Sequence, residues 1–371
     1  MPKSGKPAAT TIQQSTRSYE KWLRAHIPLL PADLQLKHER MRESPFSFLR
    51  ATFYRWMERW PAVRRELASA PEVLAVGDLH VENFGTWRDA EGRLVWGIND
   101  FDETCRLPYV QDLVRLAASA HLALAANHLK IPKREADEAI LAGYAEGLAA
   151  GGRPFVLAER GGALRVMATH RLRDPEAFWS RLTAWPTVGG ELPPGAEKAL
   201  RALLPEPDLP CRVVHRIAGL GSLGRQRFVA IAEWKGAQIA REAKALAPSA
   251  ALWAGAGDES PKILYQTLMD AAVRSPDPFV RVKRRWVVRR LAPDCSRIEL
   301  AELPAERDEA HLLRAMGKET ANVHLASRTA RSLQSDLAAR PRGWLHAAAG
   351  RMAEAVQQDW EAWTRGRSGK P

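Results

Sequence analysis

The chain of 371 residues is 46% hydrophobic and 26% charged, which is an ordinary globular composition, and it is long enough for more than one hydrophobic core. Its three widely spaced cysteines include no CxxC pair, which argues against a disulfide framework or a zinc site and favours a reducing compartment. The sequence shows no secretory signal and no apolar run of the ~20 residues that a membrane span needs. We therefore expect a cytoplasmic protein without a membrane partner.

The formal net charge of +12 permits an anionic partner such as nucleic acid, an acidic membrane surface or a phosphorylated ligand. The densest basic cluster, RVKRRWVVRR at residues 281–290, alternates partly with apolar residues, which is typical of a strand with one solvated face. Phosphate recognition is the alternative interpretation of this cluster. Because no nucleic-acid-binding motif accompanies it, we do not expect nucleic acid as a partner.

In chain order, residues 1–18 are small, polar and basic without periodicity, which predicts a disordered N-terminus. Residues 19–70 have a helical pattern, with Ser44 as an N-cap and Pro45 at the first position of a helix. Two short apolar runs, EVLAVGD and RLVWGIND, flank VENFGTWRDAEG and predict two strands joined through that loop. Residues 110–150 then return to two helices with apolar stripes.

A Pro- and Gly-rich stretch at 172–210 marks a candidate boundary. Beyond it, CRVVHRIA, RQRFVAIAEW, AQIARE and FVRVKRRWVVRRLA predict an antiparallel sheet within 205–300, interrupted by one helix. The predicted organisation is a disordered N-terminus (1–18), a helical catalytic part (19–165), an antiparallel sheet with a Gly-rich hairpin (166–303), and C-terminal helices that pack with the catalytic part (304–371).

The stretch VGDLHVENFG places Asp78, His80 and Asn83 on one short loop, and WGINDFDE sets Asp100 and Asp102 at the end of an apolar strand. Phosphoryl transfer needs a carboxylate beside the acceptor hydroxyl and two further oxygen ligands for magnesium. An Asp followed five residues later by an Asn supplies the carboxylate and one ligand, and an Asp on a nearby strand supplies the other. The spacing from Asn83 to Asp100 fits a small hairpin that would bring the two loops together. The alternatives are turn-capping roles for Asp78 and Asn83 and a solvated loop charge for Asp102.

These motifs resemble the aminoglycoside and choline phosphotransferase branch of the protein-kinase-like superfamily, whose loops read G-D-x-H-x-x-N and I-D-F-D or I-D-F-E. The resemblance implies that Asp78 is the catalytic base, that His80 buttresses its loop, and that Asn83 and Asp100 bind magnesium. Asp112 would match the family's loop-anchoring Asp. More closely, GDLHVENFG…INDFDE, RMRESPFSFLRA and GLGSLGRQRF together look like the bacterial domain-of-unknown-function family 2252, over most of residues 37–330.

The segment RIAGLGSLGRQRFVAIAEW contains a GxGxxG made by Gly219, Gly221 and Gly224, with Ser222 inside it. The residues that follow alternate as a strand and do not open a helix. This favours a strand–loop–strand hairpin that covers ATP phosphates over a dinucleotide-binding turn. An ordinary Gly-rich hairpin is the alternative.

The next strand offers Arg241 and Lys244 as the cation for the α- and β-phosphates of the nucleotide. The resembling family has Lys-Glu-Ala where REA (241–243) stands, which implies that Arg241 occupies the lysine position. Because Arg and Lys are not interchangeable at such a site, Lys244 is the alternative candidate for the phosphate-binding cation. A further alternative is that both residues are plain surface charges. Two roles are equally consistent with the position of Arg50: it could point into a phosphate site or form a surface salt bridge. His324 is expected to be a buried core residue whose hydrogen bonds are satisfied.

In an ordinary kinase the Gly-rich sheet precedes the catalytic loop, whereas here it follows. We therefore expect an α+β, protein-kinase-like fold, apparently permuted, with the helical catalytic part first and the antiparallel nucleotide-binding sheet later. The expected function is that of an ATP- and Mg2+-dependent phosphotransferase acting on an unidentified small-molecule or protein hydroxyl. A nucleotide-binding pseudokinase and a metal-dependent phosphohydrolase are the alternatives.

Overall fold

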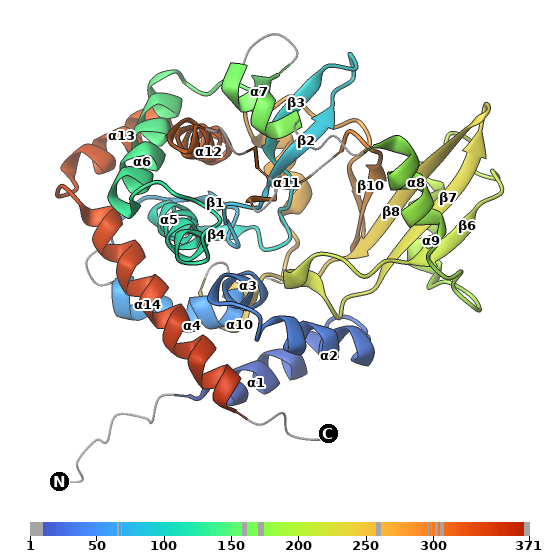
Figure 1. Cartoon of the computed structure of the whole chain (residues 1–371), viewed down its shortest axis with the longest axis horizontal. Helices are drawn as coiled ribbons and strands as arrows, with labels where there is room; N and C mark the ends of the chain where they lie inside the picture. The colour runs from blue at the N-terminus through green and yellow to red at the C-terminus, as the bar shows by residue number, and fades with distance from the viewer. Residues whose placement is uncertain are drawn as a thin grey trace.

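The computed structural model describes residues 10–64, 67, 69–157, 162–169, 174–256, 261–295, 297, 299–300, 303–304 and 308–366. Within these residues the chain is a mixed α+β structure with fourteen α-helices and three antiparallel sheets of two, three and five strands. Helices gather on one side of the molecule and the five-stranded sheet on the other (Figure 1). None of the helices in this described part of the chain combines the length and apolarity that a membrane span requires.

The N-terminal region is a set of four helices, α1 (Ile12–Arg24), α2 (Pro31–Arg40), α3 (Pro45–Ala51) and α4 (Phe53–Arg64). The predicted disorder of residues 1–18 is wrong for residues 12–18, which open α1; residues 1–9 lie outside the described residues. A capping box starts this helix: the side chain of Thr11 accepts the backbone N–H of Gln14, and the side chain of Gln14 accepts the backbone N–H of Thr11. The predicted caps of α3 are confirmed, since Ser44 accepts from the amide of Ser47 and Pro45 follows it.

The centre of the molecule holds two small sheets. Strand β1 (Glu72–Ala75) pairs with β4 (Cys105–Pro108), and β2 (Phe84–Arg88) forms a hairpin with β3 (Leu94–Ile98), which also pairs with β5 (Phe155–Val156). The sequence analysis predicted β1 and β3 but assigned β2 to the loop. The predicted small hairpin between Asn83 and Asp100 is present, and its turn lies at the sequence DAEG (residues 89–92), where the amide of Gly92 donates to the carbonyl of Asp89.

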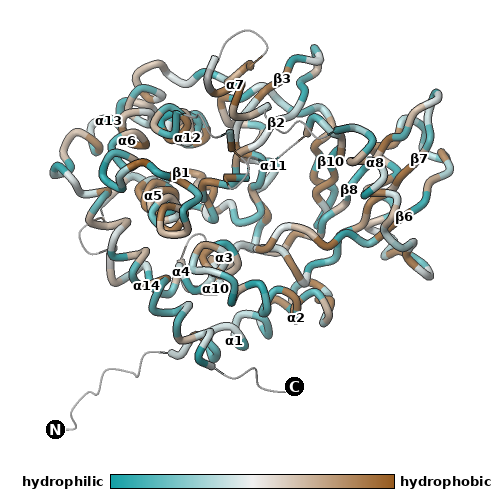
Figure 2. The backbone as a smooth tube through the Cα atoms, in the orientation of Figure 1, coloured by the Kyte–Doolittle hydropathy of each residue, from teal (hydrophilic) through white to brown (hydrophobic). Residues whose placement is uncertain are grey.

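The helical side is built around α5 (Val110–Ala125), which is apolar along much of its length (Figure 2) and almost entirely buried. It contacts α6 (Lys133–Ala149), α12 (Glu309–His324) and α14 (Trp344–Arg365), and α13 (Ala330–Ala339) packs on α6. Helices α6 and α12 approach so closely that a Cβ at Gly143 would overlap the carbonyl of Arg314, and one at Gly317 would overlap that of Ile140. Glycine at these positions therefore sets the distance between the two helices.

The five-stranded sheet has the order β6 (Arg212–His215), β7 (Arg227–Trp234), β8 (Ala237–Ala245), β10 (Trp286–Leu291), β9 (Arg281–Lys283). All neighbours are antiparallel, so the predicted antiparallel sheet is confirmed. The basic cluster at 281–290 is not one strand as predicted. It is the hairpin of β9 and β10, because Arg284 adopts the left-handed conformation (φ 56°) at the turn.

Short helices complete the sheet region. Helices α8 (Pro175–Thr183) and α9 (Pro194–Arg201) lie within the Pro- and Gly-rich stretch, where the sequence predicted only a boundary. The remaining helices are α7 (Gly162–Thr169), α10 (Ala250–Trp253) and α11 (Tyr265–Ala271), the last of which is the predicted interruption of the sheet. Ala243 and Ala245 of β8 pack in an apolar cluster with Ala196 and Ala199 of α9. Helix α9 therefore covers one face of the sheet, and α8, whose Phe178 and Leu182 pack with Ala240 of β8, covers part of the opposite face, on which Lys244 also lies.

Candidate active site

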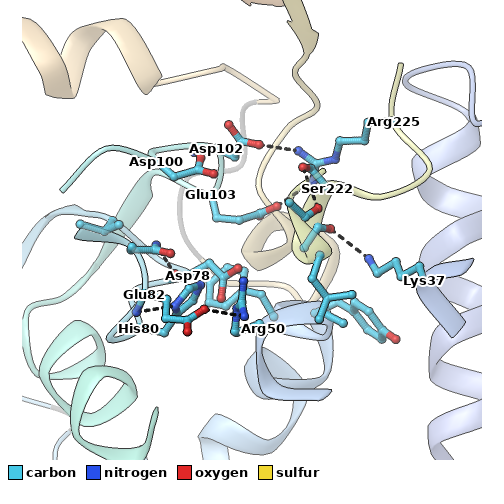
Figure 3. A pocket seen from close by; sticks show the side chains of 18 of the residues that line it. Lys37, Arg50, Asp78, His80, Glu82, Asp100, Asp102, Glu103, Ser222 and Arg225 are labelled. Carbon is cyan, nitrogen blue, oxygen red and sulfur yellow. Dashed lines mark hydrogen bonds and ion pairs between the residues drawn. The ribbon is translucent and has the colours of Figure 1, made fainter. Parts of the chain in front are cut away.

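Asp78 lies on the loop that follows β1, and the backbone before it is fixed by Asp112 of α5. The two carboxylate oxygens of Asp112 accept the amides of Val76 at 2.7 Å and Gly77 at 3.0 Å. His324 holds the same carboxylate at 3.1 Å and is fully buried, as expected of a satisfied core residue. Asp112 thus holds the loop in the way that the resemblance implied, and the loop presents Asp78 toward the cavity (Figure 3).

The side chain of Asp78 is paired with Arg115 of α5, a residue that the sequence analysis did not single out. Arg115 donates to Oδ1 of Asp78 from Nε at 2.9 Å and also from Nη2, and Nη2 donates to the carbonyl of Leu49. Its side chain has no exposed surface and stacks against Phe53 and Trp56. Burial raises the pKa of Asp78 to about 7, and the positive charge of Arg115 opposes that rise.

His80 and Glu82 lie on the same loop as Asp78 and also line the cavity. Nδ1 of His80 accepts the amide of Glu82 at 3.2 Å, so the imidazole supports the loop. Burial, together with Arg50 and Arg115, lowers the pKa of His80 well below its usual range, which keeps the ring neutral. Glu82 pairs with Arg50 at 2.6 Å. Arg50 lines the cavity and its side chain is largely buried. Its ion pair with Glu82 is therefore not a surface salt bridge, and its charge is not unpaired.

Asn83 and Asp100 are brought together by the β2–β3 hairpin that lies between them. Phe84 pairs with Ile98, and the amide of Asn99 donates to the carbonyl of Asn83 at 3.0 Å. The side-chain amide of Asn83 donates to the carbonyl of Asp78 at 2.7 Å. Nδ2 is therefore used to hold the loop, and the amide oxygen is the atom of Asn83 that could bind a metal.

Asp100 and Asp102 share one cation, Lys244 of β8. Its Nζ atom lies 2.7 Å from Asp102 and 3.3 Å from each oxygen of Asp100. Burial and the charge of Asp100 raise the pKa of Asp102 to about 6. For Asp100 burial acts in the same direction, but the charge of Lys244, the hydrogen bond with Asp102 and the more distant arginines together outweigh it and lower the pKa below its usual range. Asp100 is thus the member of the pair that ionises at the lower pH, and its side chain is 39% exposed.

The Gly-rich segment runs between β6 and β7 and turns once as a 3-10 helix at Leu220–Ser222. Gly224 leads directly toward β7 and not into a helix, as predicted, and Gly219 and Gly224 adopt the left-handed region (φ 74° and 95°). A Cβ at Gly221 would lie 3.0 Å from the carbonyl of Arg50 and 3.4 Å from Oδ2 of Asp78. The Gly-rich segment therefore lies directly against the loop that carries Asp78.

The Gly-rich segment is also bonded to itself and to α2. The amides of Ser222 and Leu223 donate to Gly219 and Leu220, so these two N–H groups are already engaged. The hydroxyl of Ser222 accepts from Arg227 at 2.6 Å. Lys37 of α2 donates to the carbonyl of Gly221 at 3.0 Å, and burial lowers the pKa of this lysine to about 8. These contacts fix the loop in place over Asp78.

Arg241 lies apart from this group, contrary to the prediction that placed it at the phosphate-binding position. Successive side chains of a strand point to opposite faces of a sheet. Arg241 therefore faces away from Lys244: its Nε donates to the carbonyl of Leu203 at 2.8 Å, and its guanidinium stacks on Phe279. Lys244, the alternative, is the residue of β8 that reaches the two carboxylates.

Asp78, Asn83, Asp100 and the Gly-rich segment line one cavity of about 80 Å³ between the helical side and the sheet. Its acidic members lie on two loops, with Ser222 and Arg225 on the opposite wall (Figure 3). Asn83, Asp100 and Asp102 supply the amide and carboxylate oxygens that magnesium prefers, so the donor set fits that ion. Lys244, on the third strand counted from β6, adds a cation on the sheet side.

Several members of the cavity carried weak signals in the sequence or none. Arg115 interrupts the apolar helix 110–125, and a charge inside such a helix is itself an indication of a buried partner. Arg225 directly follows the last glycine of the motif and holds Glu103 at 2.8 Å and Asp102 at 3.5 Å. Glu103 in turn accepts the amide of Ala250 at 2.6 Å. These partners are 122 to 147 residues apart in sequence, so local patterns do not reveal them.

A comparison with known proteins bears on the first part of this site. A family model described as "Uncharacterized protein conserved in bacteria (DUF2252)" matches residues 29–152. The matched region holds the Asp78 and Asp100 loops and Arg115, and it ends before the Gly-rich segment and Lys244. The expected family resemblance over most of residues 37–330 is thus shown for its first part. No curated protein and no solved structure matches the chain.

Proposed function

We propose that the protein is an ATP- and Mg2+-dependent phosphotransferase that acts on a hydroxyl group. The observation that carries this proposal is the meeting of three separate segments in one cavity: the Asp78–Asn83 loop, the Asp100–Asp102 loop and the Gly-rich segment. Phosphoryl transfer uses a base beside the acceptor, oxygen ligands for magnesium, and a glycine loop and a lysine over the phosphates.

The order of parts within the sheet supports the same proposal. In protein kinases the Gly-rich loop joins two strands, and the phosphate-binding lysine is on the strand after them. Here the Gly-rich segment joins β6 and β7, and Lys244 follows on β8, on the face toward Asp100. The arrangement fits a kinase-like site in which the sheet follows the catalytic loop in the chain, that is, a permuted order.

In the proposed reaction Asp78 accepts the proton of the acceptor hydroxyl while the acceptor oxygen forms a bond to the γ-phosphorus. The bond between that phosphorus and the β–γ bridging oxygen breaks, and ADP leaves. Asn83 and Asp100, with Asp102, would hold magnesium, which neutralises charge on the phosphates. Lys244 would bind the α- and β-phosphates after releasing its carboxylate partners to the metal.

The experiment that tests the proposal is calorimetric titration of ATP with and without magnesium into the parent protein and Asp100→Ala. We expect magnesium-dependent ATP binding in the parent and a loss of the magnesium effect in the variant. The Asp78→Asn variant should bind Mg-ATP nearly as the parent does but lose ~10²–10⁴-fold in turnover of ATP. Absence of ATP binding to the parent, or binding that is indifferent to magnesium, would reject the proposal.

The pairing of Asp78 with Arg115 favours a second candidate, a pseudokinase that binds nucleotide without turnover. The guanidinium of Arg115 occupies Oδ1 of Asp78 with two hydrogen bonds and makes this carboxylate a weaker proton acceptor than burial alone would make it. This candidate predicts Mg-ATP binding together with equal, background ATP turnover in the parent and in Asp78→Asn. The two candidates therefore differ in turnover and agree in binding.

A further inference from the structure

Beside the candidate active site lies a second, larger cavity of about 340 Å³ with a strongly basic lining. Among the described residues, seven arginines and three carboxylates line it. It shares Asn99, Asp100, Gly219 and Arg297 with the first cavity, so the two spaces adjoin. The arginines central to the argument are Arg216, Arg227 and Arg289 on the sheet side and Arg274 and Arg297 on the other side.

On the sheet side, three arginines converge on a single buried acid, Glu242 of β8. Arg289 donates to Glu242 at 2.8 Å, Arg227 lies 3.5 Å from it, and Arg216 also bonds to it. Although burial opposes ionisation, these three cations lower the pKa of Glu242 well below its usual range. One negative charge thus stands against three positive charges, and this wall has a net charge of +2.

On the opposite wall, Arg274 forms no ion pair with another described residue; its guanidinium stacks on Trp87 at 4.6 Å and Phe101 at 5.0 Å. Its Nε and Nη1 atoms are buried and have no hydrogen-bond partner in the described part of the chain. Arginines that are enclosed without enough carboxylates repel one another and are poorly solvated. An anion in the cavity removes both penalties.

We infer that this cavity binds a phosphate-class anionic group, at a place separate from the Lys244 carboxylate pair. Guanidinium groups on both walls offer several N–H donors, which suits phosphate better than any neutral or cationic ligand. The group belongs either to the nucleotide or to a phosphorylated acceptor, because the cavity adjoins the candidate active site. This inference rests on the cavity alone and stands apart from the proposed phosphoryl transfer.

The test is calorimetric titration of inorganic phosphate and pyrophosphate, without magnesium and at constant ionic strength. The parent protein is compared with Arg274→Gln, and Lys283→Gln serves as the matched control, since Lys283 is an exposed residue of β9 and does not line the cavity. We expect Arg274→Gln to weaken pyrophosphate binding about tenfold or more, and Lys283→Gln to change it less than about twofold. Arg274→Lys, which keeps the charge, should restore part of the loss.

Arg289→Gln provides a second variant, and circular dichroism checks that each variant is folded. The inference is overturned if the parent shows no saturable phosphate or pyrophosphate binding, or if the cavity variants and the Lys283 control lose affinity equally. Competition with saturating Mg-ATP identifies the source of the group. Loss of phosphate binding assigns the site to a nucleotide phosphate, and retained binding assigns it to a separate anionic ligand. A parent that binds pyrophosphate but not Mg-ATP would reject the proposed function alone.

Discussion

Nε of Arg115 donates a 2.9 Å hydrogen bond to Oδ1 of Asp78 from a side chain that has no exposed surface. The pair joins the candidate catalytic loop to the most buried helix of the molecule. It also sets two opposed influences on one carboxylate, because burial raises the pKa of Asp78 and the guanidinium lowers it. The balance of these influences decides the pH at which Asp78 can accept a proton.

The first prediction concerns the pH dependence of turnover. With the pKa of Asp78 raised to about 7, the carboxylate is half protonated at that pH, so kcat/KM for ATP turnover should rise with pH through 7 and level off about one pH unit above it. Arg115→Met removes the favourable cation and should shift this acidic limb upward by about 1–3 pH units. A pH–rate profile measures the shift. An unchanged limb in a folded Arg115→Met protein would exclude Asp78 as the titrating base.

The second prediction separates the two basic residues of β8. Lys244→Met should weaken Mg-ATP binding or turnover at least tenfold, because it removes the cation that faces Asp100 and Asp102. Arg241→Gln is the matched control on the same strand and should leave both within about threefold, since Arg241 faces Leu203 and Phe279. Calorimetry and steady-state kinetics supply the readouts. Equal losses in the two variants would show that the face of β8 on which a basic residue lies does not determine whether it contributes to Mg-ATP binding or turnover.

The third prediction concerns stability and Glu319, a buried acid of α12 that accepts from the amide of Ile98 and from Asn322. Burial raises the pKa of Glu319 to about 7. When the pKa of a carboxylate is higher in the folded state than in the unfolded state, its contribution to the free energy of unfolding is fully present below the unfolded-state pKa. That contribution is lost as the pH rises through the folded-state pKa. The loss between about pH 4.5 and 7 is of the order of 3 kcal/mol.

Glu319→Gln cannot ionise, so the free energy of unfolding should fall less steeply over this pH range than in the parent. Urea unfolding at several pH values measures the slope. The slope is the informative quantity because the substitution also exchanges a hydrogen-bond acceptor for a donor and changes the stability at every pH. Parallel curves for parent and variant would mean that Glu319 does not titrate in this range.

The fourth prediction concerns the close contact of α6 and α12. Gly317→Ala should lower the free energy of unfolding by about 1–3 kcal/mol, because the new Cβ would overlap the carbonyl oxygen of Ile140 and backbone must move. Gly350→Ala in α14 is the matched control, since no atom lies within 4 Å of its Cβ position, and it should be neutral or stabilising by ~0.5–1 kcal/mol. Denaturant unfolding of both variants tests the difference.

The sequence predicted those parts of the structure whose cause is local. The spacing from Asn83 to Asp100 was enough to predict a hairpin between them, although the segment of β2 was expected to be loop, and strand-like alternation after Gly224 excluded a dinucleotide-binding turn. The start of α1 also carried a local signal, the Thr11–Gln14 capping box, which the polar composition of the region obscured.

Features that depend on long-range packing could not be predicted in this way. Alternation along β8 shows that Arg241 and Lys244 occupy opposite faces, but only the folded structure shows which face α9 covers and which face reaches Asp100 and Asp102. Likewise, an arginine in the apolar helix α5 indicates a buried partner without identifying it as Asp78, because α5 and the loop are adjacent only in the folded chain.

The glycine contact of α6 with α12 has a consequence for synthesis of the chain. Gly143 emerges from the ribosome more than 150 residues before its partner helix, and the whole five-stranded sheet is made in between. Until α12 arrives, the surface of α6 that it covers remains exposed, and native contacts of such separation form slowly. A chain truncated before residue 309 should therefore bind hydrophobic dyes or holdase chaperones, and supplying the 308–366 segment in trans should reduce that binding.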